Sequence, residues 1–345
     1  MKILQLGSGS MGTRRMRDLH QRKDLALGLF DEREDRRQRA KERFGVTVFA
    51  SLEEALAWGP QALVISTPPG TKGAYVKLAL ERGLHHFIEA DIWTYGAAEN
   101  ERISREKKLV SAPSASLRFL PVVKALGTSV QEHLGTLLSY QFFMATYMPG
   151  WHTGEGKEYY ARHRNTAPSR EMIPFELSWL NPIFGPAVEV AGRYEKYGAL
   201  PADTEDTWSL SMRLKQGGCG QITITMSCPV EYRRGCCFGT NGAVSWDIYS
   251  GDLTVQTPAD KTPRTQNFGA ITNVLETMYC EEISTFVDAA LGRTTWPQSY
   301  GLSQQSTATL AAAEASFLNG KWMPVDPRAE PEAALPRHPG RRNQG

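Results

Sequence analysis

The sequence predicts an α/β protein with two domains, the first built on a parallel sheet and the second, of α+β type, on a mostly antiparallel open sheet. In the first third, short apolar runs alternate with helical stretches, an order that implies right-handed crossovers between parallel strands. After about Arg118 the hydrophobic residues instead alternate along the chain and turn signals separate the runs, as in a sheet with one buried face. A chain of 345 residues is long enough for two cores. We expect domains at 1–117 and 118–326.

The first domain is expected to contain six strands with helices between them. The strands are Lys2–Leu6, Leu25–Phe30, Val46–Phe49, Ala62–Ser66, His86–Glu89 and Lys108–Ser111, and helical segments include Arg33–Phe44, Leu52–Trp58 and Gly73–Arg82. Ligands bind a parallel sheet at the carboxyl ends of its strands. The residues that follow the first, fourth and fifth strands are therefore where a site is expected.

A glycine-rich turn, Gly7-Ser8-Gly9-Ser10-Met11-Gly12, directly follows the first strand and opens a helical segment. Gly7 allows the tight turn, Gly9 lets the backbone approach a phosphate, and Gly12 lets the helix pack against the strand. The helix N-terminus offers free N–H groups to the anion. Asp31 ends the second strand about 20 residues further on, where an acid would accept from ribose hydroxyls. The pattern predicts a Rossmann domain that binds NAD, and nearby Arg33 leaves NADP open.

The second domain is expected to form strands and hairpins followed by two helices. The segments are a strand at Thr136–Thr146, alternating runs at Trp208–Leu214 and Ile222–Met226, a hairpin around Asn241-Gly242 from Cys236–Phe238 to Val244–Ile248, a strand at Leu253–Val255, and helices at Thr277–Leu291 and Leu302–Phe317. Trp208 and Trp246 are expected in the core or in an interface rather than in the site. The segment 327–345, rich in Pro, Arg, Gly and Glu, is expected to be disordered.

Composition narrows the partners to small molecules. The formal net charge of +2 argues against a nucleic-acid-binding surface, and no long apolar run suggests a membrane span. The five cysteines include no C-x-x-C pair, so we expect neither a metal site nor a disulfide framework, and a cytoplasmic location. Cys236 and Cys237 are neighbours in a strand-like run and should point to opposite faces of the sheet.

Two further segments carry a family resemblance. Val64-Ile65-Ser66-Thr67-Pro68-Pro69 and Ala79–Glu89, together with the glycine turn, resemble the Gfo/Idh/MocA oxidoreductases, and Leu117–Pro121 resembles the start of that family's second domain. The resemblance implies an NAD(P)-dependent redox step on a sugar, nucleotide sugar, cyclitol or related polyol. It also implies that Thr67 and Pro68 line the nicotinamide side, with Ser66 as a further cofactor contact, and that the open sheet pairs subunits into a homo-oligomer.

The chain departs from this family where its catalytic groups stand. The family's Glu-Lys-Pro motif reads Glu89-Ala90-Asp91, and alanine cannot exchange a proton, so Ala90 is expected only as a cofactor contact. Glu89 is expected as a cofactor-side or structural contact rather than as a base. Lys72 stands where a histidine is customary. Glu176 lies near the position of the family's catalytic histidine, and Pro174, if it stands in a first helical turn, would put Glu176 close to a helix start.

The segment Met148–Arg162 is the expected source of a replacement, because it resembles a substrate-side loop of some family members. His152 exchanges protons near neutral pH, so His152, with Tyr160 and Glu176, is a candidate acid or base. Substrate contacts are expected from Trp151, His152, Tyr159, Arg162 and Arg118; an ordinary surface loop is the alternative. Three functions remain open: a dehydrogenase with a relocated acid/base, a redox-neutral enzyme that retains its cofactor, and a non-catalytic cofactor-binding paralogue or partner subunit.

Overall fold

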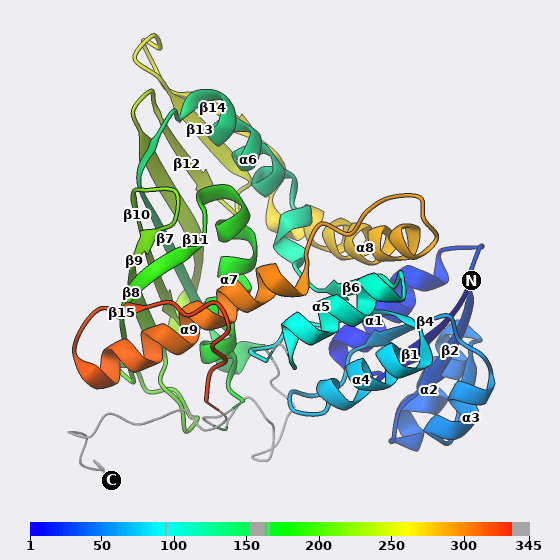
Figure 1. The fold of residues 1–345 in the computed structure, drawn as a ribbon. Coiled ribbons are helices and arrows are strands. Elements are labelled where there is room, and N and C mark those ends of the chain that lie inside the picture. The colour runs from blue at the N-terminus through cyan, green and yellow to red at the C-terminus, as the bar shows by residue number, and fades with distance from the viewer. Residues whose placement is uncertain (94, 152–162, 164–165, 333–345) are drawn as a thin grey trace. The chain divides into compact units, whose positions relative to one another are not determined.

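The computed structural model describes residues 1–93, 95–151, 163 and 166–332, and its chain divides into two compact units (Figure 1). Unit 1 comprises Met1–Phe119 and Glu276–Ser303, and unit 2 comprises Leu120–Leu275 and Gln304–Gly345. The segment Glu276–Ser303 thus returns to the first unit, although a single division near residue 117 would place it in the second. His152, Tyr159, Tyr160, Arg162 and most of the segment 327–345 lie outside the described residues.

Unit 1 contains a six-stranded parallel sheet of order β3-β2-β1-β4-β5-β6, which confirms the predicted fold class (Figure 1). Its strands are β1 (Lys2–Leu6), β2 (Ala26–Phe30), β3 (Thr47–Phe49), β4 (Ala62–Ile65), β5 (His85–Ile88) and β6 (Ser111–Pro113). Its helices are α1 (Ser10–His20), α2 (Glu34–Phe44), α3 (Leu52–Ala57), α4 (Lys72–Arg82) and α5 (Ala97–Glu106), with the 3-10 helix η1 (Ser116–Phe119). Two long helices, α8 (Ile271–Ala290) and α9 (Tyr300–Asn319), belong to it in part.

The sixth strand begins later than the sequence suggested. Lys108 has a left-handed φ of 54°, and the Leu109 N–H donates back to the carbonyl of Ser104 on α5. Both residues therefore belong to the C-terminal turn of α5, and pairing with β5 starts at Ser111. The apolar run Lys108–Ser111 looked like a strand because it combines this turn with the first strand residue.

The core of unit 1 covers both faces of the sheet. Leu4, Leu6 and Ile65 pack with residues of α4 on one face, whereas Ile3 and Val64 pack with Ile283, Phe286 and Val287 of α8 on the other. Strands buried on both faces read as continuous apolar runs, which is how they were recognised. The α8 contacts explain why Glu276–Ser303 returns to this unit.

Unit 2 contains a nine-stranded sheet of order β14-β13-β12-β11-β7-β10-β9-β8-β15, in which only the β7–β10 pair is parallel. Its strands are β7 (Leu137–Tyr147), β8 (Ala187–Glu195), β9 (Thr207–Leu214), β10 (Cys219–Thr225), β11 (Ser227–Gly239), β12 (Ala243–Asp247), β13 (Asp252–Gln256), β14 (Arg264–Asn267) and β15 (Met323–Pro324). Its other elements are α6 (Pro121–His133), the 3-10 helix η2 (Met148–Gly150), α7 (Pro168–Phe184), the first residues of α8 and most of α9.

Several predictions for unit 2 are confirmed. The sheet is mostly antiparallel, the turn at Asn241-Gly242 joins β11 to β12, and both Trp208 and Trp246 are buried. Cys237 is buried whereas its neighbour Cys236 is only partly so, as residues on opposite faces should be. Among the described residues, no helix has the length and apolar character needed to cross a membrane.

The start of α7 corrects one prediction. The helix begins at Pro168, so Pro168 takes the first-turn position that was assigned to Pro174. Pro174 lies inside the helix, where it has no N–H to donate to a carbonyl one turn earlier. Glu176 is therefore about two turns into the helix rather than near its start.

Candidate functional site

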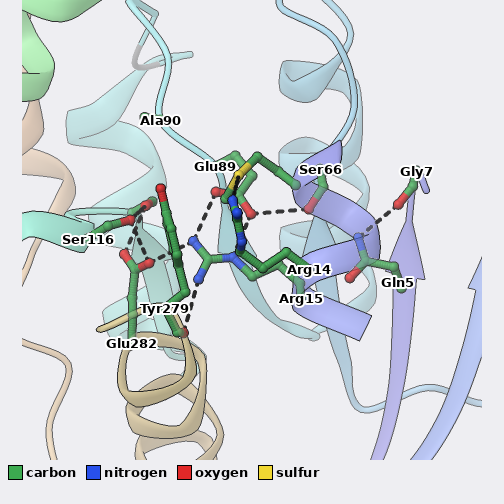
Figure 2. Close-up of polar contacts among 12 residues, drawn as sticks. Gln5, Gly7, Arg14, Arg15, Ser66, Glu89, Ala90, Ser116, Tyr279 and Glu282 are labelled. Carbon is green, nitrogen blue, oxygen red and sulfur yellow. Dashed lines mark hydrogen bonds and ion pairs between the residues drawn. The ribbon is translucent and has the colours of Figure 1, made fainter. Parts of the chain in front are cut away.

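The glycine turn has the close contacts that only glycine tolerates. Gly7 has a φ of +85°, and a Cβ there would lie 2.6 Å from the carbonyl oxygen of Ser66. A Cβ on Gly12 would lie 2.1 Å from the carbonyl oxygen of Gly7, which itself accepts from Gln5 Nε2 at 3.0 Å (Figure 2). These contacts bring β1, the turn and Ser66, the residue after β4, together.

Space opens above Gly9. Around a Cβ built on Gly9, a single atom lies within 4 Å, the Arg36 Nη1 at 3.8 Å. Gly9 caps α1, which begins at Ser10 and whose fully described first turn holds no acidic side chain. A ligand phosphate can therefore approach the backbone here and meet the N-terminal N–H groups of α1.

Asp31 lies beside this turn at the end of β2. Its Oδ2 accepts from the Ser8 N–H at 2.7 Å, and its Oδ1 accepts from the Arg33 N–H at 2.9 Å. The cation in its ion pair is Arg36, at 3.7 Å, whereas the Arg33 guanidinium pairs with Asp35. If a 2′-phosphate binds, Arg36 is thus better placed to meet it than Arg33.

The carboxyl ends of β4, β5 and β6 share a buried charge network (Figure 2). Arg15 on α1 donates to Glu89 through Nε at 2.7 Å and Nη2 at 3.0 Å, and to Glu282 of α8 at 2.6 Å. Burial disfavours the charged guanidinium, but the two carboxylates outweigh this and raise the pKa of Arg15. Ser66 Oγ also donates to Glu89, at 3.3 Å.

Glu282 is held by donors from the loop that follows β6. The Ser114 hydroxyl, the Ala115 N–H and the Ser116 hydroxyl all donate to it, at 2.7–2.9 Å. Glu89 was expected as a cofactor-side or structural contact, and its side chain, 11% exposed, is the least buried of the three side chains of this network. Sequence reasoning missed Arg15 and Glu282, because nothing local distinguishes them from residues on a solvated helix face.

The turn after β5 is held by Lys72, from the first turn of α4. Its Nζ donates to the carbonyl of Ala90 at 2.7 Å and lies 3.3 Å from Asp91 Oδ2. Nearby, the Thr71 hydroxyl donates to Thr67 Oγ1 at 2.9 Å and to the Pro68 carbonyl at 2.8 Å. The positions that carry the family resemblance thus lie at one edge of the sheet, with a lysine beside Ala90.

The sequence-based candidates in unit 2 have other surroundings. Glu176 is fully buried, accepts from Trp179 Nε1 at 2.8 Å and pairs with Arg233 at 3.0 Å. Burial raises the pKa of Glu176 despite Arg233. Trp151 is 39% exposed, and its indole N–H donates to Thr146 Oγ1 at 3.1 Å.

Arg118 makes its described contacts within unit 1. Its Nη1 donates to the carbonyl of Pro297 and to Gln298 Oε1, both at 2.8 Å, and burial lowers the pKa of Arg118. The residues that the structure describes contain no cluster of three or more His, Cys, Asp and Glu side chains suited to a metal ion.

Comparisons with known proteins agree with this geometry. Residues 1–105 match the family model Gfo/Idh/MocA, described as an oxidoreductase family with an NAD-binding Rossmann fold. No curated protein matches the sequence.

Solved structures share the fold over both units. Levoglucosan dehydrogenase in complex with NADH and levoglucosan is 14% identical, with a TM-score of 0.82, and the match covers 94% of this chain and 99% of that one. GenD2 from gentamicin A biosynthesis, in complex with NAD, is 20% identical, with a TM-score of 0.79 and 94% and 96% covered. An oxidoreductase from Agrobacterium radiobacter, in complex with NAD⁺, L-tartaric acid and magnesium, is 14% identical, with a TM-score of 0.83 and 94% and 98% covered. The N-terminal part of the chain, residues 1–105, thus matches the Gfo/Idh/MocA oxidoreductases, whose model describes an NAD-binding Rossmann fold.

Proposed function

We propose that this NAD-dependent oxidoreductase acts on a carbinol or carbonyl carbon of a sugar, nucleotide sugar, cyclitol or related polyol. The observation that carries the proposal is the glycine turn. Gly7 and Gly12 make contacts that no side chain could replace, while Gly9 leaves open space at the N-terminus of α1. A turn that is tightly packed at Gly7 and Gly12 and open at Gly9 fits a dinucleotide pyrophosphate.

The surrounding residues fit the rest of such a cofactor. Asp31 stands beside the turn where the adenosine ribose would lie, and Ser66, Thr67, Pro68 and Glu89 occupy the strand ends proposed for the nicotinamide side. When bound, the nicotinamide accepts or returns the hydride of the substrate carbon. The protein's own task is to orient the substrate and to move the proton of the reacting oxygen.

The substrate class is supported by resemblance and by one exposed aromatic residue. The structural neighbours named above include complexes with levoglucosan and with L-tartaric acid, both polyhydroxylated molecules. Trp151 presents an indole whose N–H is fixed by Thr146, so its ring is available to pack against the apolar face of a sugar. We propose that the segment from Trp151 to Arg162 lines the substrate site and that His152 and Tyr160 remain proton-transfer candidates there.

Fluorescence titration with NADH and NADPH tests the cofactor. We expect the wild type to bind NADH, and Gly9→Ala to keep its fold but bind NADH at least ten times more weakly, because the new methyl group occupies the phosphate approach. Gly12→Ala, whose methyl group would meet the backbone of Gly7, is expected to unfold or misfold instead. Failure of the wild type to bind either nucleotide would contradict the proposal.

Turnover of a panel of sugars and cyclitols, followed at the nicotinamide absorbance band, tests the reaction. A net absorbance change supports oxidation or reduction of the substrate. Product formed without a net change indicates a redox-neutral reaction by transient oxidation. Cofactor binding with no turnover across the panel favours the non-catalytic alternative.

A further inference from the structure

A buried group of titratable side chains stands at the end of β5, apart from the Arg15 network. Lys72 Nζ contacts the Glu89 carbonyl at 3.3 Å, the Ala90 carbonyl at 2.7 Å and Asp91 Oδ2 at 3.3 Å. The Tyr95 hydroxyl donates to the same Asp91 oxygen at 2.6 Å, and the Ile92 N–H donates to Asp91 Oδ1 at 2.8 Å. Lys72, Asp91 and Tyr95 are therefore connected by hydrogen bonds and an ion pair through the Asp91 carboxyl group. We call these three residues the Lys72 cluster.

The backbone around the Lys72 cluster is arranged at a cost. Tyr95 adopts a left-handed φ of 53°, which is uncommon for a residue with a side chain. Its ring lies against Gly73, where a Cβ would come within 2.6 Å of Tyr95 Cδ1. The Lys72 and Asp91 side chains are only 5% and 3% exposed. Residues with a strained backbone persist only where the surrounding structure holds them in place. Such residues concentrate at functional sites.

The location supports a role in the reaction. The cluster joins the end of β5 to the first turn of α4, at the edge where a parallel sheet binds its ligand. Tyr95 is partly exposed, whereas the Lys72 and Asp91 side chains are almost fully buried. Tyr95 is thus the residue of the cluster through which we expect a ligand to make contact.

We propose that Tyr95 exchanges the proton with the reacting oxygen of the substrate, and that Asp91 and Lys72 pass that proton to and from Tyr95. The proposal rests on the proposed oxidoreductase function. Neither Glu89, bound by Arg15, nor Glu176, fully buried and paired with Arg233, is as well placed to donate to a substrate. Among the described residues, the Lys72 cluster offers a proton donor and its resupply in one chain of contacts.

The proton balance follows from the contacts. In reduction, the substrate carbon receives two electrons and a hydrogen nucleus as hydride from the reduced nicotinamide cofactor. The Tyr95 O–H bond breaks as a new O–H bond forms on the substrate oxygen. The Asp91 carboxylate takes a proton from the Lys72 ammonium and passes it to the Tyr95 phenolate, which leaves Asp91 a carboxylate and Lys72 neutral. Neutral Lys72 is then reprotonated from water, and oxidation runs the same transfers in reverse.

Three variants separate this relay from a structural role. Tyr95→Phe removes the hydroxyl and keeps the ring that packs on Gly73. Lys72→Arg keeps a positive charge and donors, but arginine does not give up its proton in proteins. Lys72→Met combined with Asp91→Asn leaves no unpaired buried charge, which preserves the fold. Tyr75→Phe, on the same helix α4 and outside the cluster, is the matched control.

We expect Tyr95→Phe, Lys72→Arg and the double variant to lower kcat on a panel substrate by about 100-fold or more, the usual contribution of general acid–base catalysis. The Kd for NADH should stay within about twofold, and Tyr75→Phe and the circular dichroism spectra should be unchanged. The pH profile of kcat should change in the double variant. Full activity of Tyr95→Phe or of Lys72→Arg, or loss confined to His152→Ala, would overturn the proposal.

A second measurement needs no substrate. The emission of bound NADH depends on the charges around the nicotinamide ring, so we expect its pH dependence to change in the double variant and to stay unchanged in Tyr75→Phe. Identical emission in the wild type and the double variant across pH 6–9 would place the cluster away from the ring and overturn the proposal. A wild type that binds no NADH would instead contradict the proposed function itself.

Discussion

Replacing Arg15 by methionine should destabilise unit 1 far more than the same change at its neighbour Arg14. The Arg15 side chain is fully buried and bonds both Glu89 and Glu282 (Figure 2). Arg14 pairs with Glu276, but both side chains are partly exposed, at 26% and 50%. The two substitutions remove the same charge from adjacent positions of one helix, so burial is the main difference between them.

The magnitude follows from what each substitution leaves behind. Removing one partner of a buried ion pair typically costs about 3–5 kcal/mol, because the remaining charge is uncompensated. Glu282 keeps its donors from Ser114, Ala115 and Ser116, and Glu89 keeps Ser66, so we expect the lower end, about 3 kcal/mol. The exposed Arg14 pair should contribute less than about 1 kcal/mol.

Urea denaturation followed by circular dichroism, and calorimetry, measure this difference. At about 2–4 °C per kcal/mol for a unit of this size, Arg15→Met should lower Tm by roughly 10 °C and Arg14→Met by less than about 4 °C. Adding Glu89→Gln to Arg15→Met should restore part of the loss, because one uncompensated charge disappears. Equal losses for the two single variants would refute the reasoning that buried charge balance stabilises this edge of the sheet.

Three more outcomes are expected. Burial lowers the pKa of His86 to about 4, so the unfolded chain binds more protons than the folded one between pH 4 and 6.5. The free energy of unfolding should therefore fall by about 3 kcal/mol as pH drops through this window. In His86→Gln, the urea midpoint should depend less on pH. For Glu176 the sign is opposite. Its pKa is raised in the folded state, so its contribution to stability should decrease as pH rises above the ordinary carboxyl value, and Glu176→Gln should remove that decrease in denaturation curves. Ala90→Lys adds a cation beside Lys72, so we expect no gain of sugar-dehydrogenase turnover from this substitution alone. A large gain in the absorbance assay would show that Lys72 does not supply the proton of the reaction.

The elements that sequence reasoning placed correctly are those whose signal is local. β1 and β4 are continuous apolar runs, and the glycine turn follows β1 without a gap. The hairpin at Asn241-Gly242 is equally local. By contrast, the short strand β15 was missed because its pairing partner, β8, lies far away in the sequence and neither strand has a strong alternating pattern.

In the candidate site, too, residues with a local sequence signal could be predicted and residues that meet only through packing could not. Asp31 could be found by counting from the glycine turn, but the partners Arg15 and Glu282 are 267 residues apart and meet only through the packing of α8. Glu176 was placed near a helix start because Pro174 carries the same local signal as Pro168, and the helix in fact begins at Pro168. Lys72 was noticed as a departure from the family pattern, yet its reach to the turn after β5 depends on the arrangement of α4 and β5.

Lys72 and Ala90 are best understood as one feature. The turn after β5 presents two backbone carbonyls and the Asp91 carboxylate inward, and a buried set of acceptors requires a donor. A lysine at position 90 would lie in the same turn whose acceptors Lys72 contacts from α4. Two ammonium groups would then compete for these three acceptors. Alanine at position 90 keeps the backbone acceptors and adds no second charge. Alanine at position 90 and a buried lysine at position 72 are therefore mutually consistent, because Ala90 adds no second charge next to the acceptors that Lys72 already contacts.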